Sequence, residues 1–121
     1  WRGFATGGSK VLFRFGFKGA ARICVTEAAI DAMSLGAIEK ARRDTLYVST
    51  GGGWSPATDG AIRMLGERPD VRFVAATDAN TQGEAFVARL RELAGELSCD
   101  FERLKPRAED WNAMLKEGAI A

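Results

Sequence analysis

The residues best suited to chemistry in this sequence are polar side chains that directly follow short apolar runs. Glu27 follows the run 22–26, and Asp78 follows the run 71–77, with Asn80 two positions further on. Carboxylate and amide oxygens are ligands that Mg²⁺ takes, and two carboxylates brought together repel unless a cation lies between them. If the two runs are neighbouring strands of one sheet, Glu27 and Asp78 meet at its edge. We therefore predict that Glu27 and Asp78, assisted by Asn80, bind Mg²⁺ or Mn²⁺ in a site suited to phosphoryl transfer or phosphodiester cleavage.

The absence of histidine removes several common kinds of active site. Without histidine, the chain can form neither a zinc site of the usual nitrogen and sulfur type, nor a Ser-His-Asp triad, nor a Cys-His pair. The two cysteines, Cys24 and Cys99, lie far apart in the sequence, so we expect two buried, reduced thiols. Chemistry in this chain must therefore depend on carboxylates, lysines or a hard metal ion.

The first 26 residues contain five basic side chains and no acidic one. The whole chain carries a net charge of only +1, so the remainder is mildly acidic. A basic segment beside an acidic body suits contact with a phosphate backbone, and the predicted contacts are Lys10, Arg14 and Lys18. An ordinary solvated surface is the competing interpretation.

The glycines at 51–53 follow another apolar run, at a place where backbone N–H groups could turn toward an anion. Gly51 and Gly52 are therefore candidate phosphate contacts. A tight turn from a strand into a helix is the commoner explanation of such a run, and both interpretations stay open here.

Two further acids are candidates for a supporting role around the metal. Asp31 lies four residues after Glu27, on the same side of an expected helix, and Asp110 lies near the C-terminus. A carboxylate in the first turn of a helix is also favoured by the helix dipole, which is the competing interpretation of Asp31. Glu84 is explained more simply, as the capping-box partner of Thr81.

Strand and helix patterns alternate along the chain. Short apolar, β-branched runs predict buried strands, and apolar stripes at helical spacing predict amphipathic helices. The expected strands are 22–26, 45–50, 71–77 and 99–104, and the expected helices begin near 28, 56, 81 and 110. This order predicts an α/β fold with a mostly parallel four-stranded sheet flanked by helices. We expect residues 1–20 to form a basic strand or hairpin extension and residues 21–121 to form the main domain.

Three segments resemble motifs of the Toprim family. Residues 25–35 are similar to its first motif, a strand-end glutamate followed by a helix, and residues 77–83 to its second, Asp-x-Asp followed by glycine. Residues 110–112, Asp-Trp-Asn, are similar to a segment of Toprim-like domains in plasmid- and phage-type primase or mobilisation proteins. The resemblance covers about residues 21–117 and implies a Rossmann-like Toprim fold. It makes Glu27 the general acid or base, and Asp78 with Asn80 the metal ligands.

Asn80 departs from the family pattern, because it stands where the second motif has an aspartate. If the site is catalytically active despite Asn80, the resemblance implies a Mg²⁺-dependent nucleotidyl transferase or nuclease-type domain. Such a domain would act on DNA, single-stranded or nicked. With a degenerate site, it implies a non-catalytic Toprim module that docks DNA or protein within a larger replication or mobilisation protein. A third interpretation is a receiver-like domain with Asp78 as phosphoacceptor, but no strand can be assigned before the lysine it would need, Lys105.

The chain begins with Trp1, so we expect a segment of a longer polypeptide whose other domains are among its partners. No run approaches the roughly 20 uncharged apolar residues that a membrane helix needs. We therefore expect a cytoplasmic protein without a membrane partner.

Overall fold

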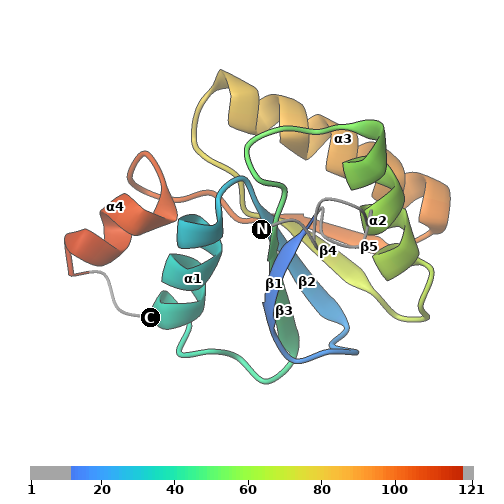
Figure 1. The fold of residues 1–121 in the computed structure, drawn as a ribbon, viewed down its shortest axis with the longest axis horizontal. Coiled ribbons are helices and arrows are strands. Elements are labelled where there is room, and N and C mark those ends of the chain that lie inside the picture. The colour runs from blue at the N-terminus through green and yellow to red at the C-terminus, as the bar shows by residue number, and fades with distance from the viewer. Residues whose placement is uncertain (1–11, 119–121) are drawn as a thin grey trace, which may run out of the picture.

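The computed structural model describes residues 12–118, which contain five strands and four helices (Figure 1). The strands are β1 (Phe13–Gly16), β2 (Arg22–Thr26), β3 (Thr45–Ser49), β4 (Arg72–Ala75) and β5 (Asp100–Arg103). The helices are α1 (Ala29–Ile38), α2 (Pro56–Gly66), α3 (Thr81–Leu97) and α4 (Trp111–Lys116). From β2 onward, strand and helix alternate as the sequence predicts. None of the helices in this range is long and apolar enough to cross a membrane.

The five strands form one sheet in the order β1-β3-β2-β4-β5. Strands β2 to β5 are parallel, and β1 runs antiparallel to β3 at one edge. The predicted mostly parallel α/β sheet is therefore confirmed. β2 lies between β3 and β4, with Thr26 opposite Ser49 and Val25 opposite Ala75. The carboxyl ends of β2 and β4 consequently lie next to each other.

The chain reverses its direction of travel across the sheet after β3. It passes from β2 outward to β3, and then returns past β2 to β4 and β5. Right-handed crossovers in opposite directions place their helices on opposite faces of a sheet. Accordingly, α1 lies on one face, together with α4, and α2 and α3 lie on the other (Figure 1). In open α/β sheets, ligands bind outside the carboxyl ends of the strands at such a reversal.

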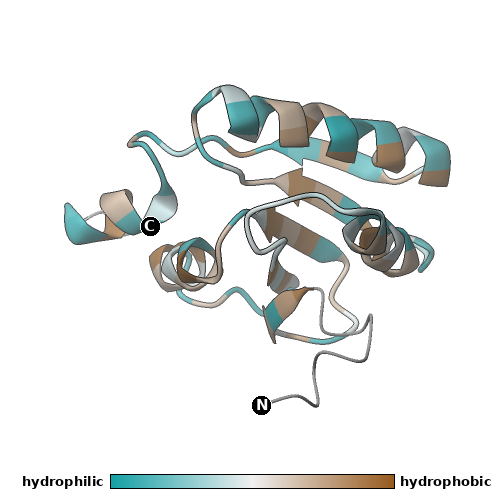
Figure 2. Cartoon of the chain, turned by 45° about the horizontal axis from the view of Figure 1, so that its top comes forward, coloured by the Kyte–Doolittle hydropathy of each residue, from teal (hydrophilic) through white to brown (hydrophobic). Residues whose placement is uncertain are grey.

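Two apolar cores lie between the sheet and its helices. Figure 2 shows the hydropathy of each residue along the ribbon, with hydrophobic stretches in the strands of the sheet. Successive residues of β2 divide between them, because side chains alternate across a strand: Ile23 and Val25 pack toward α2 and α3, and Cys24 packs toward α1 and α4. The second core includes Trp111, whose indole Nε1 donates a 2.8 Å hydrogen bond to the carbonyl of Ala76. This bond ties the start of α4 to the segment that leaves β4.

Both cysteines are free thiols, as the sequence predicts. Cys24 is fully buried, and this burial raises the pKa of its thiol to about 12. Cys99 is only partly buried, between the end of α3 and β5. Neither thiol lies among the acidic residues of the site described below.

The segment expected as an N-terminal extension contributes a strand to the main sheet. β1 forms an antiparallel ladder with β3, so the sheet has five strands where the sequence analysis counted four. Phe15 stacks on Tyr47 with ring centroids 5.0 Å apart. Gly36 of α1 makes room for the same ring, because a Cβ at this position would lie 2.5 Å from Phe15 Cζ. The first eleven residues, including Lys10, lie outside the described part of the chain.

Replacing Phe15 with alanine tests whether β1 is integral to this fold. Phe15 is half-buried, so we expect Phe15→Ala to lower the free energy of unfolding by about 2 kcal/mol, somewhat less than for a fully buried phenylalanine. Phe17 is 41% exposed and serves as the control, with an expected loss below about 1 kcal/mol. Urea unfolding measures both. Equal losses for the two variants would show that β1 does not depend on the contact with Tyr47.

Candidate metal centre

Glu27 and Asp78 lie side by side at the carboxyl edge of the sheet. The backbone N–H of Asp78 donates a 2.9 Å hydrogen bond to Glu27 Oε2. Glu27 Oε1 accepts a second bond, 3.2 Å long, from Nε2 of Gln82. The Glu27 side chain is buried, with 6% of its residue surface exposed. The structure thus brings together the two acids that the sequence places at adjacent strand ends.

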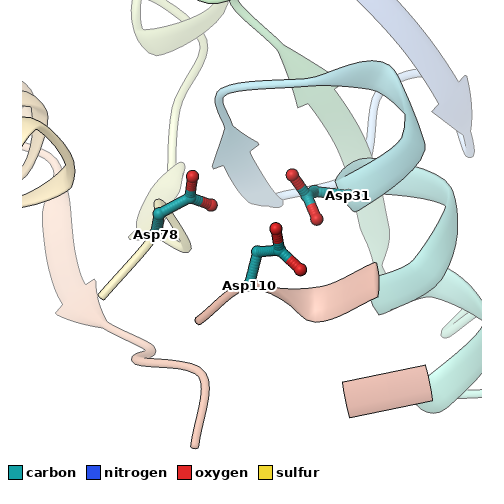
Figure 3. A group of neighbouring side chains, drawn as sticks. All are labelled: Asp31, Asp78 and Asp110. Atoms are coloured by element: carbon teal, nitrogen blue, oxygen red, sulfur yellow. The ribbon is translucent and has the colours of Figure 1, made fainter. Parts of the chain in front are cut away.

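Three aspartates from distant parts of the chain converge beside this pair (Figure 3). Asp31 belongs to the first turn of α1, Asp78 follows β4, and Asp110 directly precedes α4. One carboxylate oxygen of each lies within 4.8 Å of those of the other two. This spacing lets the three oxygens ligate one cation.

Backbone hydrogen bonds orient two of the three aspartates. Asp110 is the N-cap of α4, and its Oδ1 accepts a 2.8 Å bond from the N–H of Ala113. Asp31 Oδ1 accepts a 3.1 Å bond from the N–H of Asn112, and so connects α1 to the start of α4. The Asp-Trp-Asn segment therefore supplies one carboxylate, holds a second one, and buries its tryptophan in the core.

Asp78 differs from the other two because one of its oxygens has no partner. Its Oδ1 is buried and makes no hydrogen bond within the described residues. Burial, and after it the nearby charges of Glu27, Asp31 and Asp110, together raise the pKa of Asp78 to about 7. Burial also raises the pKa of Asp31, against the opposing hydrogen bond from Asn112. A buried, unpartnered oxygen inside a cluster of like charges is the environment that a divalent cation stabilises.

Asn80 is the N-cap of α3. Its Oδ1 accepts a 2.7 Å hydrogen bond from the N–H of Gly83. The predicted capping box is therefore wrong: Thr81 is the first residue of the helix, and Glu84 forms a 2.6 Å ion pair with Arg103 instead. Asparagine is a better cap than threonine, which explains why Asn80 caps the helix in place of Thr81. A role for Asn80 as metal ligand stays a prediction.

The glycine loop after β3 lies against Glu27. The N–H of Gly52 donates a 2.7 Å bond to the carbonyl of Glu27, and the carbonyl of Gly52 accepts a 3.4 Å bond from Gln82. Gly51 and Gly52 have φ values of 80° and 96°, which favour glycine. A tight turn therefore accounts for these glycines, and phosphate contact stays a prediction.

Arg14 and Lys18 occupy a different region. They line a hollow between β1 and α2 together with Leu65 and Arg68, and none of the three aspartates borders it. Both basic side chains are exposed. Their contact with phosphate stays a prediction, and the hollow that they line is separate from the acidic cluster.

Sequence reasoning ranked the acids differently from the structure. It gave Asp31 and Asp110 a supporting role, whereas their carboxylates lie in the same cluster as that of Asp78. Two signals were present: the spacing of four residues between Glu27 and Asp31, and the Asp-Trp-Asn segment. Neither could show that α4 packs against α1, which brings Asp110 to the cluster.

Stability should depend on pH through Asp78. Its pKa is about 7 in the folded chain against an ordinary 3.8, so the folded state binds more protons between these values. Without metal, stability should therefore fall as pH rises from about 4 to 7 and then level off. Asp78→Asn removes this charge and should stabilise the chain at pH 8 by about 1 to 2 kcal/mol, after allowance for screening by solvent.

Asp59→Asn is the matched control, measured by thermal unfolding in EDTA across the same pH range. A hydrogen bond from Arg89 lowers the pKa of Asp59 to about 2, so this substitution should destabilise the chain at pH 8. If Asp78→Asn also destabilised the chain at pH 8, the Asp78 carboxylate would not be repelled by its acidic neighbours.

Gly83 keeps the Asp78 loop close to α3. A Cβ on Gly83 would lie 1.9 Å from the carbonyl oxygen of Asp78, a backbone atom that can move only with the loop. We expect Gly83→Ala to cost roughly 2 to 3 kcal/mol of stability. Gly95→Ala in the same helix meets nothing within 4 Å and should stabilise by up to about 1 kcal/mol. Chemical denaturation compares the two, and a neutral Gly83→Ala would contradict the close approach.

Comparison with protein families shows which family the chain resembles. The family model described as Toprim-like matches residues 24–115, which include Glu27 and all three aspartates of the cluster. Comparison with curated proteins and with solved structures gave no match. Because the match covers most of the chain, and because the strand order and the acidic edge agree with it, this chain belongs to the Toprim-like family.

Proposed function

We propose that this domain catalyses metal-dependent phosphoryl transfer or phosphodiester cleavage on DNA. The observation that carries the proposal is the convergence of Asp31, Asp78 and Asp110, with the unpartnered oxygen of Asp78 among them. When bound, Mg²⁺ or Mn²⁺ would neutralise this cluster and polarise a phosphate of the substrate. Toprim domains act on nucleic acids, which makes DNA, single-stranded or nicked, the substrate to test first.

Glu27 is the proposed proton carrier. Its Oε2 is held by the N–H of Asp78, which sets the distance between the carboxylate and the aspartate cluster. Within residues 12–118, its Oε1 is bound only by the amide of Gln82, an exposed side chain that a substrate can displace. We therefore assign the proton transfer to Oε1, with Oε2 as the anchored oxygen.

A non-catalytic docking module is the second candidate function. Asn80 favours it, because the amide that replaces the family's aspartate caps α3 through its oxygen. The site would then hold one negative charge fewer and bind metal more weakly. The two candidates differ in what they require of Glu27, since only catalysis needs its proton.

Metal binding is tested by titrating Mn²⁺ while following thermal unfolding. A metal that binds only the folded chain should stabilise it by about 2.7 kcal/mol at one hundred times the dissociation constant. Asp110→Asn should weaken the affinity at least about tenfold, because it removes one charged ligand. Glu109→Gln is the matched control, since it removes a neighbouring charge from outside the cluster and should lower the affinity much less. Equal weakening by both substitutions would contradict the cluster as the site.

Catalysis is tested by Glu27→Gln. The amide preserves the size of the side chain but cannot exchange a proton, so cleavage or nucleotidyl transfer on DNA should fall at least about a hundredfold. Mn²⁺ affinity should fall less than with Asp110→Asn, and the melting temperature should stay near that of the parent. Retained activity would remove Glu27 from the chemistry. Mn²⁺ binding without any activity in the parent would instead support the docking module.

A further inference from the structure

Arg103, the last residue of β5, binds the segment that carries Asp78. Its Nη1 donates hydrogen bonds to the carbonyls of Ala75 and Thr77, at 3.0 and 2.9 Å. Its Nη2 donates to the carbonyl of Asp78 at 3.2 Å and to Glu84 Oε2 at 2.6 Å. One guanidinium therefore contacts three carbonyls within four consecutive residues, and fixes the path of the chain as it leaves β4.

The carbonyls of Thr77 and Asp78 need a donor because the strand ladder ends before them, whereas the carbonyl of Ala75 also accepts a 3.0 Å bond from the N–H of Leu104. Ala75 is the last residue of β4, and the paired register between β4 and β5 ends at Ala75 and Arg103. Beyond this point, Thr77 and Asp78 have no strand partner for their carbonyl groups among the bonds of the sheet. A planar guanidinium with several N–H groups can serve separate acceptors at once, whereas a lysine ammonium lacks this geometry.

The segment that Arg103 holds also carries Asp78, whose carboxylate is repelled by the neighbouring acids. Asp78 is hydrogen-bonded to Glu27 through its backbone, its carboxylate lies in the cluster with Asp31 and Asp110, and the mutual repulsion of these acids favours movement of the Asp78 loop away from the cluster. Arg103 lies on the backbone side of this loop, with its own charge paired to Glu84, so it can restrain the loop without neutralising the Asp78 carboxylate. Its side chain is only 17% exposed, which shields these bonds from water.

We infer that Arg103 is a positioning residue, which holds the Asp78 backbone so that the Asp78 carboxylate stays in the metal cluster before metal binds. This inference rests on the proposed metal function. Removing a residue that orients a metal ligand lowers metal affinity by about 10- to 100-fold in known sites. We expect a loss in that range for Arg103→Met, which keeps a long side chain but removes every donor.

The test compares the full chain with Arg103→Met, Arg103→Lys and a matched control, Arg89→Met. Arg89 also clamps two elements through its guanidinium, with two 2.8 Å bonds from α3 to Asp59 of α2, away from the cluster. The first measurement is Mn²⁺ affinity by electron paramagnetic resonance. The second, without metal, is hydrogen exchange at the amide of Asp78, which donates to Glu27 in the structure.

We expect Arg103→Met and Arg103→Lys to weaken Mn²⁺ binding and to speed exchange at the Asp78 amide, and Arg89→Met to change neither. If Arg103→Met fails to fold, Arg103→Lys decides, because it keeps the charge and the stem. Parental affinity and parental exchange in a folded Arg103 variant would overturn the inference, as would equal effects in Arg89→Met. If the parent binds no Mn²⁺, the proposed function fails, and the exchange measurement still decides the role of Arg103.

Discussion

Repulsion between carboxylates at the edge of the sheet is the constraint on which the candidate site depends. Asp31, Asp78 and Asp110 approach one another closely enough to share a cation, with the buried Glu27 beside them. Such a cluster persists only because backbone hydrogen bonds and packing hold each member in place. Asp110 caps α4, Asp31 is bound by the N–H of Asn112, and Glu27 is bound by the N–H of Asp78. The scaffold therefore sustains a charge density that favours a divalent ion.

The order of the strands explains why this cluster forms at one place. β2 lies in the middle of the sheet, and the chain leaves it toward β3 but later returns to β4 on its other side. The ends of β2 and β4 consequently face the same crevice, with α1 beginning on one side and α3 on the other. α4 completes the site because Trp111 is anchored in the core beneath it. Each acid thus lies in or next to a helix or strand that packs in the core without help from the metal.

The region around Asn80 shows how local helix chemistry and site chemistry compete for one residue. An aspartate here would add a further charge near the cluster, whereas the asparagine uses its oxygen to cap α3. Capping keeps the loop from Asp78 to Gly83 short and close to the helix, as the approach of Gly83 to the Asp78 carbonyl shows. The loop is therefore held by α3 on one side and by Arg103 on the other. This arrangement fixes the position of Asp78 without any contact to its carboxylate.

The sequence alone determined the class of the fold, because alternating buried runs and amphipathic stripes are local patterns that allow few other arrangements. It also identified Glu27 and Asp78, since both directly follow apolar runs. Only the tertiary structure decided that Asp31 and Asp110 join the cluster, that β1 adds a fifth strand, and that Arg103 reaches the Asp78 loop. These contacts join residues far apart in the chain, and they depend on which helix packs on which face and on the neighbours each strand acquires. The spacing of residues along the sequence does not tell which helix packs on which face or which strands are neighbours, because packing in three dimensions determines both.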